Sequence, residues 1–153
     1  MAEIRRQFDG WIALSGAIST GNQIAAALVM GADFAYMGTR FMATREANAD
    51  EACKTMLVES TAADIVYTAA FTGVPGNYLR GSIVRAGLDP DNLPEREAGR
   101  ISYASGSSRP KAWKDLWGAG QGVGSIDDLP SVAQLVHRLK SELLMTKNSS
   151  QWT

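Results

Sequence analysis

Two short apolar runs near the start of the chain predict β-strands. Trp11 to Leu14 is continuously apolar, which is typical of a strand that is buried on both faces, as in parallel sheets. Asp33 to Met37 is a second short run of the same kind. A helical pattern fills the segment between the two runs. Since strands joined in this way pair in parallel through a right-handed crossover, residues 13–41 predict a βαβ unit.

The helix inside this unit has recognisable ends. Ser19 or Thr20 is suited to cap its N-terminus, and Gly31 is placed to end it in the left-handed conformation at about residue 30. Its apolar face comprises Ile24, Ala27 and Leu28. A further helix is expected before the first strand, because Ile4 and Phe8 lie four positions apart in a charged context.

The rest of the chain predicts helices separated by polar and glycine-rich segments. A last helix begins near Asp128 or Pro130 and has apolar residues at helical spacing. These residues, which predict a docked face, are Val132, Leu135, Val136, Leu139 and Leu143. The other predicted segments are helices over 47–60, 79–86 and 111–117, an extended segment over 64–73, an exposed loop over 87–110 and a glycine-rich loop over 118–126.

Composition limits the classes of function. The chain has 153 residues, of which 45% are hydrophobic and 20% charged, and this is enough for one sizeable core. A formal charge of -1 gives no electrostatic reason to expect nucleic acid or an anionic membrane as a partner. The single cysteine, Cys53, excludes an intrachain disulfide and favours a packing role in a reducing compartment. No apolar stretch is long enough to span a membrane, so we expect a cytoplasmic protein.

Small residues at the ends of the two predicted strands suggest an anion site. Gly16 and Ala17 follow the first strand, and Gly38 and Thr39 follow the second. Since parallel strands end at the same edge of a sheet, these positions offer backbone N–H groups and a hydroxyl beside a helix N-terminus. Phosphate is often bound in this way after the last two strands of (β/α)8 barrels. Ordinary packing of a βα turn is the alternative, and a Rossmann site lacks its glycine pattern because Gly16 stands alone before Gly21.

The run "LSGAISTGNQIAAALVMGADFAYMGTRF" resembles the last two βα units of the flavin-dependent nitronate monooxygenases, formerly called 2-nitropropane dioxygenases. "WKDLWGAGQGVGSIDDLPSVAQLV" resembles their C-terminal segment. Flavin-type enoyl reductases and IMP dehydrogenase-like barrels share a looser version of the first run. The resemblance implies an FMN-binding (β/α)8 barrel that oxidises alkyl nitronates with O2.

Carried over by position, the resemblance assigns a cofactor-binding set. Gly16, Ala17, Met37, Gly38 and Thr39 would present groups to the FMN phosphate. The family more often has a second glycine where this chain has Ala17. Gln121, in the glycine-rich loop, is either a further donor to the flavin or part of a plain loop.

Three other residues with chemical potential have simpler interpretations. Arg40 is interpreted as a surface ion pair rather than an anion ligand. His137, the only histidine, is expected to be partly exposed on the last helix and not to act as a base. In the family, proton abstraction is assigned to a histidine in a "GGH"-like segment, which this chain does not contain, so no catalytic residue is assigned.

We therefore expect an α/β chain that forms the C-terminal part of a (β/α)8 TIM barrel. Residues 1–60 would supply about the last two βα units, and residues 61–153 a helical C-terminal extension. A complete barrel needs about 250 residues, so the chain is expected to be inactive alone and to associate with a missing barrel half or with itself. The alternatives are a flavin enoyl reductase or other FMN barrel oxidoreductase, and a non-catalytic module that completes a barrel with another chain.

Overall fold

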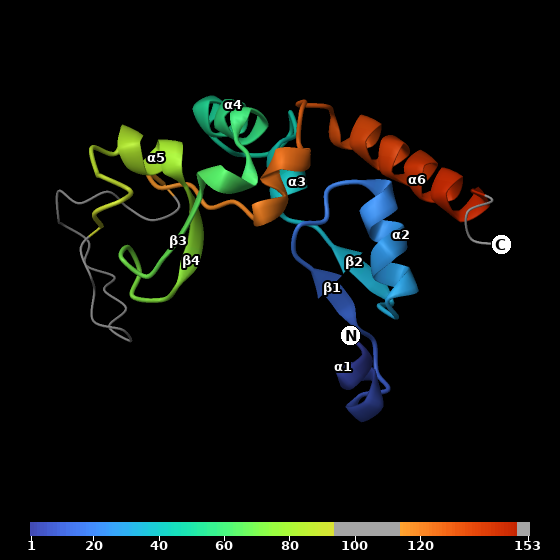
Figure 1. The fold of residues 1–153 in the computed structure, drawn as a ribbon. Helices are drawn as coiled ribbons and strands as arrows, with labels where there is room; N and C mark the ends of the chain where they lie inside the picture. Colours follow the sequence, from blue (N-terminus) through green and yellow to red (C-terminus); the bar gives the residue numbers. More distant parts are fainter. Residues whose placement is uncertain (94–113, 150–153) are drawn as a thin grey trace.

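The computed structural model describes residues 1–93 and 114–149. Figure 1 shows a short parallel sheet and its neighbouring helices at one end of the molecule and a β-hairpin at the other. Short helices and a 3₁₀ segment lie between them. The elements are α1 (Ala2–Gln7), β1 (Ala13–Ser15), α2 (Gly21–Val29), β2 (Phe34–Tyr36), α3 (Thr39–Met42), α4 (Glu51–Glu59), η1 (Ala62–Asp64), β3 (Ile65–Thr68), β4 (Gly76–Leu79), α5 (Arg80–Arg85), η2 (Gln121–Ser125) and α6 (Val132–Asn148).

The predicted strand–helix–strand unit is confirmed. β1 and β2 pair in parallel, with Ser15 opposite Tyr36. Thr20 is the N-cap of α2 and forms a capping box with Gln23, whose side chain accepts the Thr20 N–H at 3.0 Å. Gly31 ends the helix with φ +96°, in the left-handed region where only glycine is unstrained.

Only one face of this parallel pair is covered. Leu14 and Ala35 pack with residues of α2, and their neighbours along each strand point to the opposite face. On that opposite face Phe34 and Tyr36 are 55% and 66% exposed, and Trp11 is 78% exposed. The expectation of a strand buried on both faces was therefore wrong, because within the described residues no second layer covers this side.

The longest helix, α6, packs along α2. Leu135 and Leu139 are buried as predicted, whereas Val136 is 49% exposed and lies outside the packed face. The two helices are in tight contact at Gly21, where a Cβ would lie 2.4 Å from the backbone oxygen of Leu139. Only a residue without a side chain allows this approach.

The second sheet is an antiparallel hairpin of β3 and β4, with Ile65 opposite Leu79. β3 falls inside the segment predicted as extended. β4 was not predicted, since its Gly-Asn start indicates a turn. The predicted short helix after it is confirmed as α5, beginning at Arg80.

Other predicted elements need correction. The helix expected over 47–60 begins only at Glu51, because Asp50 caps it by accepting the N–H of Ala52 at 2.8 Å. The short helix α3 was not predicted. Residues 111–113 lie outside the described part, and residues 114–117 form a turn and an extended segment instead of a helix. There the backbone pairs with β4, as the N–H of Leu79 donates to the Trp117 carbonyl at 2.8 Å. The loop expected over 87–110 is described only to residue 93.

The central core joins α4, β4 and η2. Cys53 and Leu57 of α4 pack there with Leu79, Trp117 and Val123. Burial raises the pKa of the Cys53 thiol, so the thiol stays protonated and chemically quiet. This confirms the interpretation of Cys53 as a packing residue. Among the described helices, none combines the length and the apolarity that crossing a membrane requires.

The contact at Gly21 generates a stability prediction. Gly21→Ala would place a methyl group against the α6 backbone, whose atoms cannot rotate away. We expect the free energy of unfolding to fall by about 1–3 kcal/mol, the usual cost of overpacking. Urea unfolding followed by circular dichroism measures the change. The comparison variant is Ala26→Gly, which also changes α2 by one methyl group but adds nothing against α6. An unchanged urea midpoint for Gly21→Ala would contradict the close packing.

The uncovered aromatic face generates a second prediction. Trp11 and Phe34 rings lie 5.6 Å apart, centroid to centroid, and extend the apolar surface of the sheet. Exposed contiguous apolar surface and open strand edges promote association. We expect the isolated chain to self-associate in light scattering, and Phe34→Ser to reduce this. Tyr67→Ser, which removes a 71% exposed aromatic from the other sheet, is expected to have little effect. A monomeric unaltered chain would overturn the prediction.

Candidate functional site

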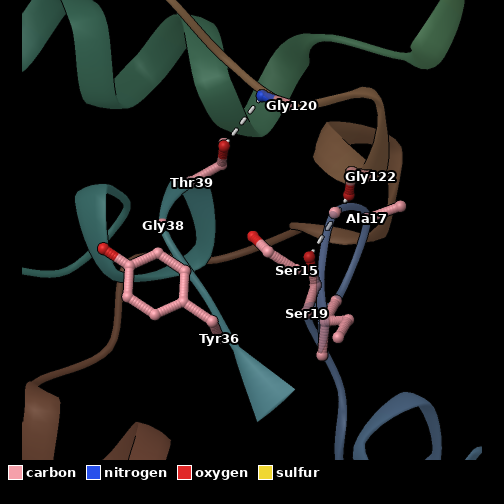
Figure 2. Close-up of a pocket in the computed structure, with 10 residues that line it drawn as sticks. Ser15, Ala17, Ser19, Tyr36, Gly38, Thr39, Gly120 and Gly122 are labelled. Atoms are coloured by element: carbon pink, nitrogen blue, oxygen red, sulfur yellow. Dashed lines mark hydrogen bonds between the residues drawn. The ribbon is translucent and has the colours of Figure 1, made fainter. Parts of the chain in front are cut away.

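A pocket of about 160 Å³ lies at the carboxyl ends of β1 and β2. Figure 2 shows its lining, in which the turn after β1 faces the start of α3 and the segment around η2 closes over both. The lining residues are Ser15, Gly16, Ala17, Ile18, Ser19, Tyr36, Gly38, Thr39, Gly120 and Gly122. All are uncharged, so any anion held there would contact backbone amides and hydroxyl groups.

The turn after β1 is shaped by two residues with positive φ. Gly16 has φ +108° and Ala17 has φ +53°. Ala17 is the only non-glycine residue of the described chain in this region, where a side chain costs about 1 kcal/mol. A Cβ built on Gly16 would meet no atom within 4 Å, so the space beside this backbone is open. The turn therefore brings bare backbone to the pocket.

The end of β2 contributes a second stretch of backbone. Gly38 is the N-cap of α3, and Thr39 is its first residue. N–H groups in the first turn of a helix have no intrahelical acceptor. A Cβ on Gly38 would also meet nothing within 4 Å. Both strand ends thus present open backbone to one pocket, as expected from their parallel pairing.

A segment distant in the sequence completes the pocket. The hydroxyl oxygen of Thr39 accepts the N–H of Gly120 at 2.8 Å, and the hydroxyl of Ser19 donates to the Gly122 carbonyl at 3.3 Å. A Cβ on Gly122 would lie 2.6 Å from Cα of Ala17. The chain around η2 therefore touches one strand end and is hydrogen-bonded to both βα turns.

Four of the six predicted binding residues line the pocket and two do not. Gly16, Ala17, Gly38 and Thr39 are part of its lining. Met37 instead packs against the apolar cluster of α2 and the parallel strands. The Gln121 side chain is exposed, and the pocket is lined by its two glycine neighbours. Whether any of these residues binds FMN stays a prediction.

Sequence reasoning missed several lining residues. Ser15 and Tyr36 are the last residues of the two strands and occupy the exposed face. Their alternation with the partly buried Leu14 and Ala35 was the signal that could have identified them. Ser19 was considered only as a helix cap.

The N-terminus of α2 contributes less to an anion site than expected. The N–H of Gly21 donates to the carboxylate of Glu142 at 2.6 Å, and Thr20 caps the N–H of Gln23. A carboxylate from α6 thus already neutralises the positive end of this helix dipole. The backbone groups that are open to the pocket lie earlier in the chain, in the turn after β1 at Gly16 and Ala17.

Arg40 forms an ion pair, but not at the surface. The side chain is 2% exposed, and its guanidinium donates to the carboxylate of Asp128 and to the Ala43 carbonyl at 3.1 and 3.2 Å. Asp128 also accepts two hydrogen bonds from Arg138 of α6. Hydrogen bonds from Arg138, followed by the charges of Arg138 and Arg40, lower the pKa of the Asp128 carboxyl. This network fixes α3 behind the pocket.

The remaining candidate chemistry is sparse. His137 is exposed on α6, as predicted, and does not line the pocket. No group of three or more His, Cys, Asp or Glu residues that could hold a metal ion occurs in residues 1–93 and 114–149. The side-chain polar groups that line the pocket are all hydroxyls.

Comparison with known proteins identifies the family. Residues 11–142 match the family model described as "Nitronate monooxygenase". The chain belongs to the nitronate monooxygenase family. It is 34% identical to a nitronate monooxygenase of Paraburkholderia phytofirmans over 137 residues, which are 84% of this chain and 37% of that protein. The resemblance inferred from the sequence is thus confirmed, and the family is one of oxidoreductases.

Solved structures agree with this assignment. The chain is similar to nitroalkane oxidase from Streptomyces ansochromogenes, with a TM-score of 0.73 and 30% identity over 95% of this chain and 43% of that one. It is also similar to FabK from Thermotoga maritima, with a TM-score of 0.67 and 25% identity over 95% of this chain and 48% of that one. The chain therefore spans less than half the length of these relatives. The predicted α/β class is confirmed.

The Asp128 network generates a pH prediction. Because the folded-state pKa of Asp128 is lowered, its charge stabilises the fold above the ordinary carboxyl pKa of about 3.9, and this stabilisation is lost as pH falls through the folded value. We expect Asp128→Asn to lower the free energy of unfolding by about 1–2 kcal/mol at pH 7. The difference from the unaltered chain should shrink below about pH 4.

Urea unfolding at pH 7 and pH 3 measures both effects. Asp91→Asn is the control, since Asp91 pairs with Arg80 but its side chain is 73% exposed, and exposed pairs contribute little. Equal losses of unfolding free energy for the two variants would show that the buried position of Arg40 does not depend on its ion pair with Asp128.

Proposed function

We propose that this chain carries the phosphate end of an FMN site in a nitronate monooxygenase that oxidises alkyl nitronates with O2. In this proposal residues 1–60 supply the last two βα units of a (β/α)8 barrel, and residues 61–153 form an extension on it. The observation that carries the proposal is the pocket formed jointly by the ends of two consecutive parallel strands. Membership of an oxidoreductase family supports it.

The residues present fit a phosphate group. Open space beside Gly16 and Gly38 lets an anion approach their backbones directly. Amides held by a strand end and a short helix are fixed in position before a ligand arrives, which favours binding. The Thr39 hydroxyl, which accepts the Gly120 N–H, keeps its own proton to donate in the same lining. The assigned binding residues are Gly16, Ala17, Gly38 and Thr39.

The chemistry of the bound flavin would be oxidation of the substrate with O2. This chain's part is to bind and orient the cofactor. Tyr36 and Ser15 lie on the uncovered face of the sheet and would face the interior of the barrel.

His137 is not in the pocket lining, so the chain alone is proposed to have no proton-abstracting base and no turnover. Met37 and Gln121 are proposed at most as indirect neighbours of the phosphate. The cytoplasm remains its predicted location.

A second candidate is another flavin-dependent barrel oxidoreductase. The TM-score with FabK is close to the TM-score with nitroalkane oxidase, and this favours keeping the second candidate. Both candidates use the same proposed phosphate pocket and differ in substrate. A non-catalytic module that completes a barrel with another chain is favoured only by the uncovered aromatic face.

The phosphate proposal is tested by comparing FMN with riboflavin, which lacks the phosphate. We expect the chain to bind FMN more tightly, as measured by flavin fluorescence. Gly38→Asp places a carboxylate in the open space beside the backbone, and like charges at close range repel strongly. The variant should therefore lose about tenfold or more in FMN affinity, equivalent to about 1.4 kcal/mol, while riboflavin binding stays unchanged.

Gly38→Asn is the matched control, because it has the same shape without the charge. It should lose less FMN affinity than Gly38→Asp. Equal binding of FMN and riboflavin by the unaltered chain would refute the phosphate site.

A further inference from the structure

α6 is attached to both of the segments that follow the parallel strands and form the proposed pocket. After β1, its Glu142 carboxylate accepts the N–H of Gly21, the first residue of α2, at 2.6 Å. After β2, its Arg138 guanidinium donates to Asp128, whose carboxylate also accepts from Arg40 of α3 at 3.1 Å. One helix is therefore connected to the two strand ends through two separate polar contacts.

We propose that Arg138 and Glu142 are positioning residues, which together hold the two sides of the pocket at the spacing that a bound phosphate group requires. The inference rests on the proposed FMN-phosphate site. The two sides are here called the β1 wall, residues 16–19, and the β2 wall, which is Gly38 and Thr39. Neither of the two charged side chains lines the pocket, so α6 is assigned the role of a brace between the walls.

The two side chains are suited to this role by their positions on α6. Arg138 and Glu142 are four residues apart, so they project from the same side of the helix. Leu139 lies between them and is 6% exposed, and its backbone oxygen lies so close to Gly21 that a Cβ there would clash. Figure 1 shows α6 running beside α2. The tight contact fixes α6 on α2, and this fixes where the Arg138 guanidinium meets Asp128.

Each contact lies close in the chain to the wall that it holds. Gly21 is two positions after Ser19, which lines the pocket, and such residues are at most about 7 Å apart between their Cα atoms. Arg40 directly follows Thr39 of the β2 wall. A shift of either contact is therefore passed on to a pocket wall within two residues.

The strands alone do not set the spacing of the walls. β1 and β2 have three residues each, and their pairing ends with Ser15 opposite Tyr36. The walls lie beyond this last pair, and the β1 wall turns away through the positive φ of Gly16 and Ala17. Backbone amides bind an anion well when they converge on it. The distance between the walls therefore affects the affinity for a phosphate group, but not the affinity for a ligand without one.

Removing either contact tests the brace. Glu142→Ala removes the acceptor for the Gly21 N–H, and Arg138→Met removes the guanidinium but keeps a long apolar side chain. We expect each variant to lose about threefold to tenfold of the preference for FMN over riboflavin, the equivalent of one net hydrogen bond. Flavin fluorescence measures both affinities. Partial unfolding lowers both by the same factor, so their ratio reports on the pocket and not on the stability of the fold.

Two further variants of α6 are matched controls. Glu142→Gln retains a side-chain oxygen that can accept the Gly21 N–H, and it should keep the preference for FMN. Lys140→Met removes an exposed cation from the same helix and should also leave the ratio unchanged. Circular dichroism checks the fold of every variant. A loss in either control as large as the loss in Glu142→Ala would contradict the brace.

The double variant distinguishes one shared brace from two local effects. If both contacts hold one spacing, removing the second costs little once the first is lost. Arg138→Met combined with Glu142→Ala should therefore lose about as much preference as the more affected single variant. Losses that multiply, or an unchanged ratio in both single variants, would overturn the inference and leave the proposed function in place. Equal binding of FMN and riboflavin by the unaltered chain would refute the phosphate site, and the inference with it.

Discussion

The parallel pairing of β1 with β2 is the constraint on which the site depends. Its register sets Ser15 beside Tyr36, so the backbone leaves both strands at the same edge of the sheet and in the same direction. The positive φ of Gly16 and the N-terminus of α3 at Gly38 then turn two backbones toward one volume. A shift by one residue would exchange the faces of the strand and move the polar ends away from the pocket.

The pocket is lined by uncharged residues, and this follows from how the nearby charges are used. Arg40 directly follows Thr39, yet its guanidinium is buried and paired with Asp128. Its Nε is the one buried side-chain polar atom of the described residues without a hydrogen-bond partner, so the pair with Asp128 must offset much of the cost of burying the charge. Arg40 thus holds α3 in position through its contacts with Ala43 and Asp128 and contributes no charge to the pocket lining.

Sequence reasoning succeeded where the deciding interactions are local. The Thr20 capping box and the left-handed Gly31 lie within a few residues of the helix that they bound, so the βαβ unit was predictable. It failed where a distant segment decides. Arg40 is buried because Asp128, 88 positions away, pairs with it. Residues 114–117 are not helical because their backbone pairs with β4. Distant contacts also shape the loop of Gln121: its side chain is exposed, and the glycines beside it reach the pocket through contacts with Thr39 and Ser19.

The uncovered face and the pocket are consequences of one arrangement. α2 covers the side of the sheet that carries Leu14 and Ala35, which leaves Phe34 and Tyr36 exposed on the other side. Tyr36 belongs to both features, since it is exposed on the sheet and also lines the pocket. In the proposed barrel, the elements that cover this face also border the part of the ligand that extends out of the pocket. In that proposal, covering the aromatic surface of the sheet and enclosing the flavin ring are the same structural event.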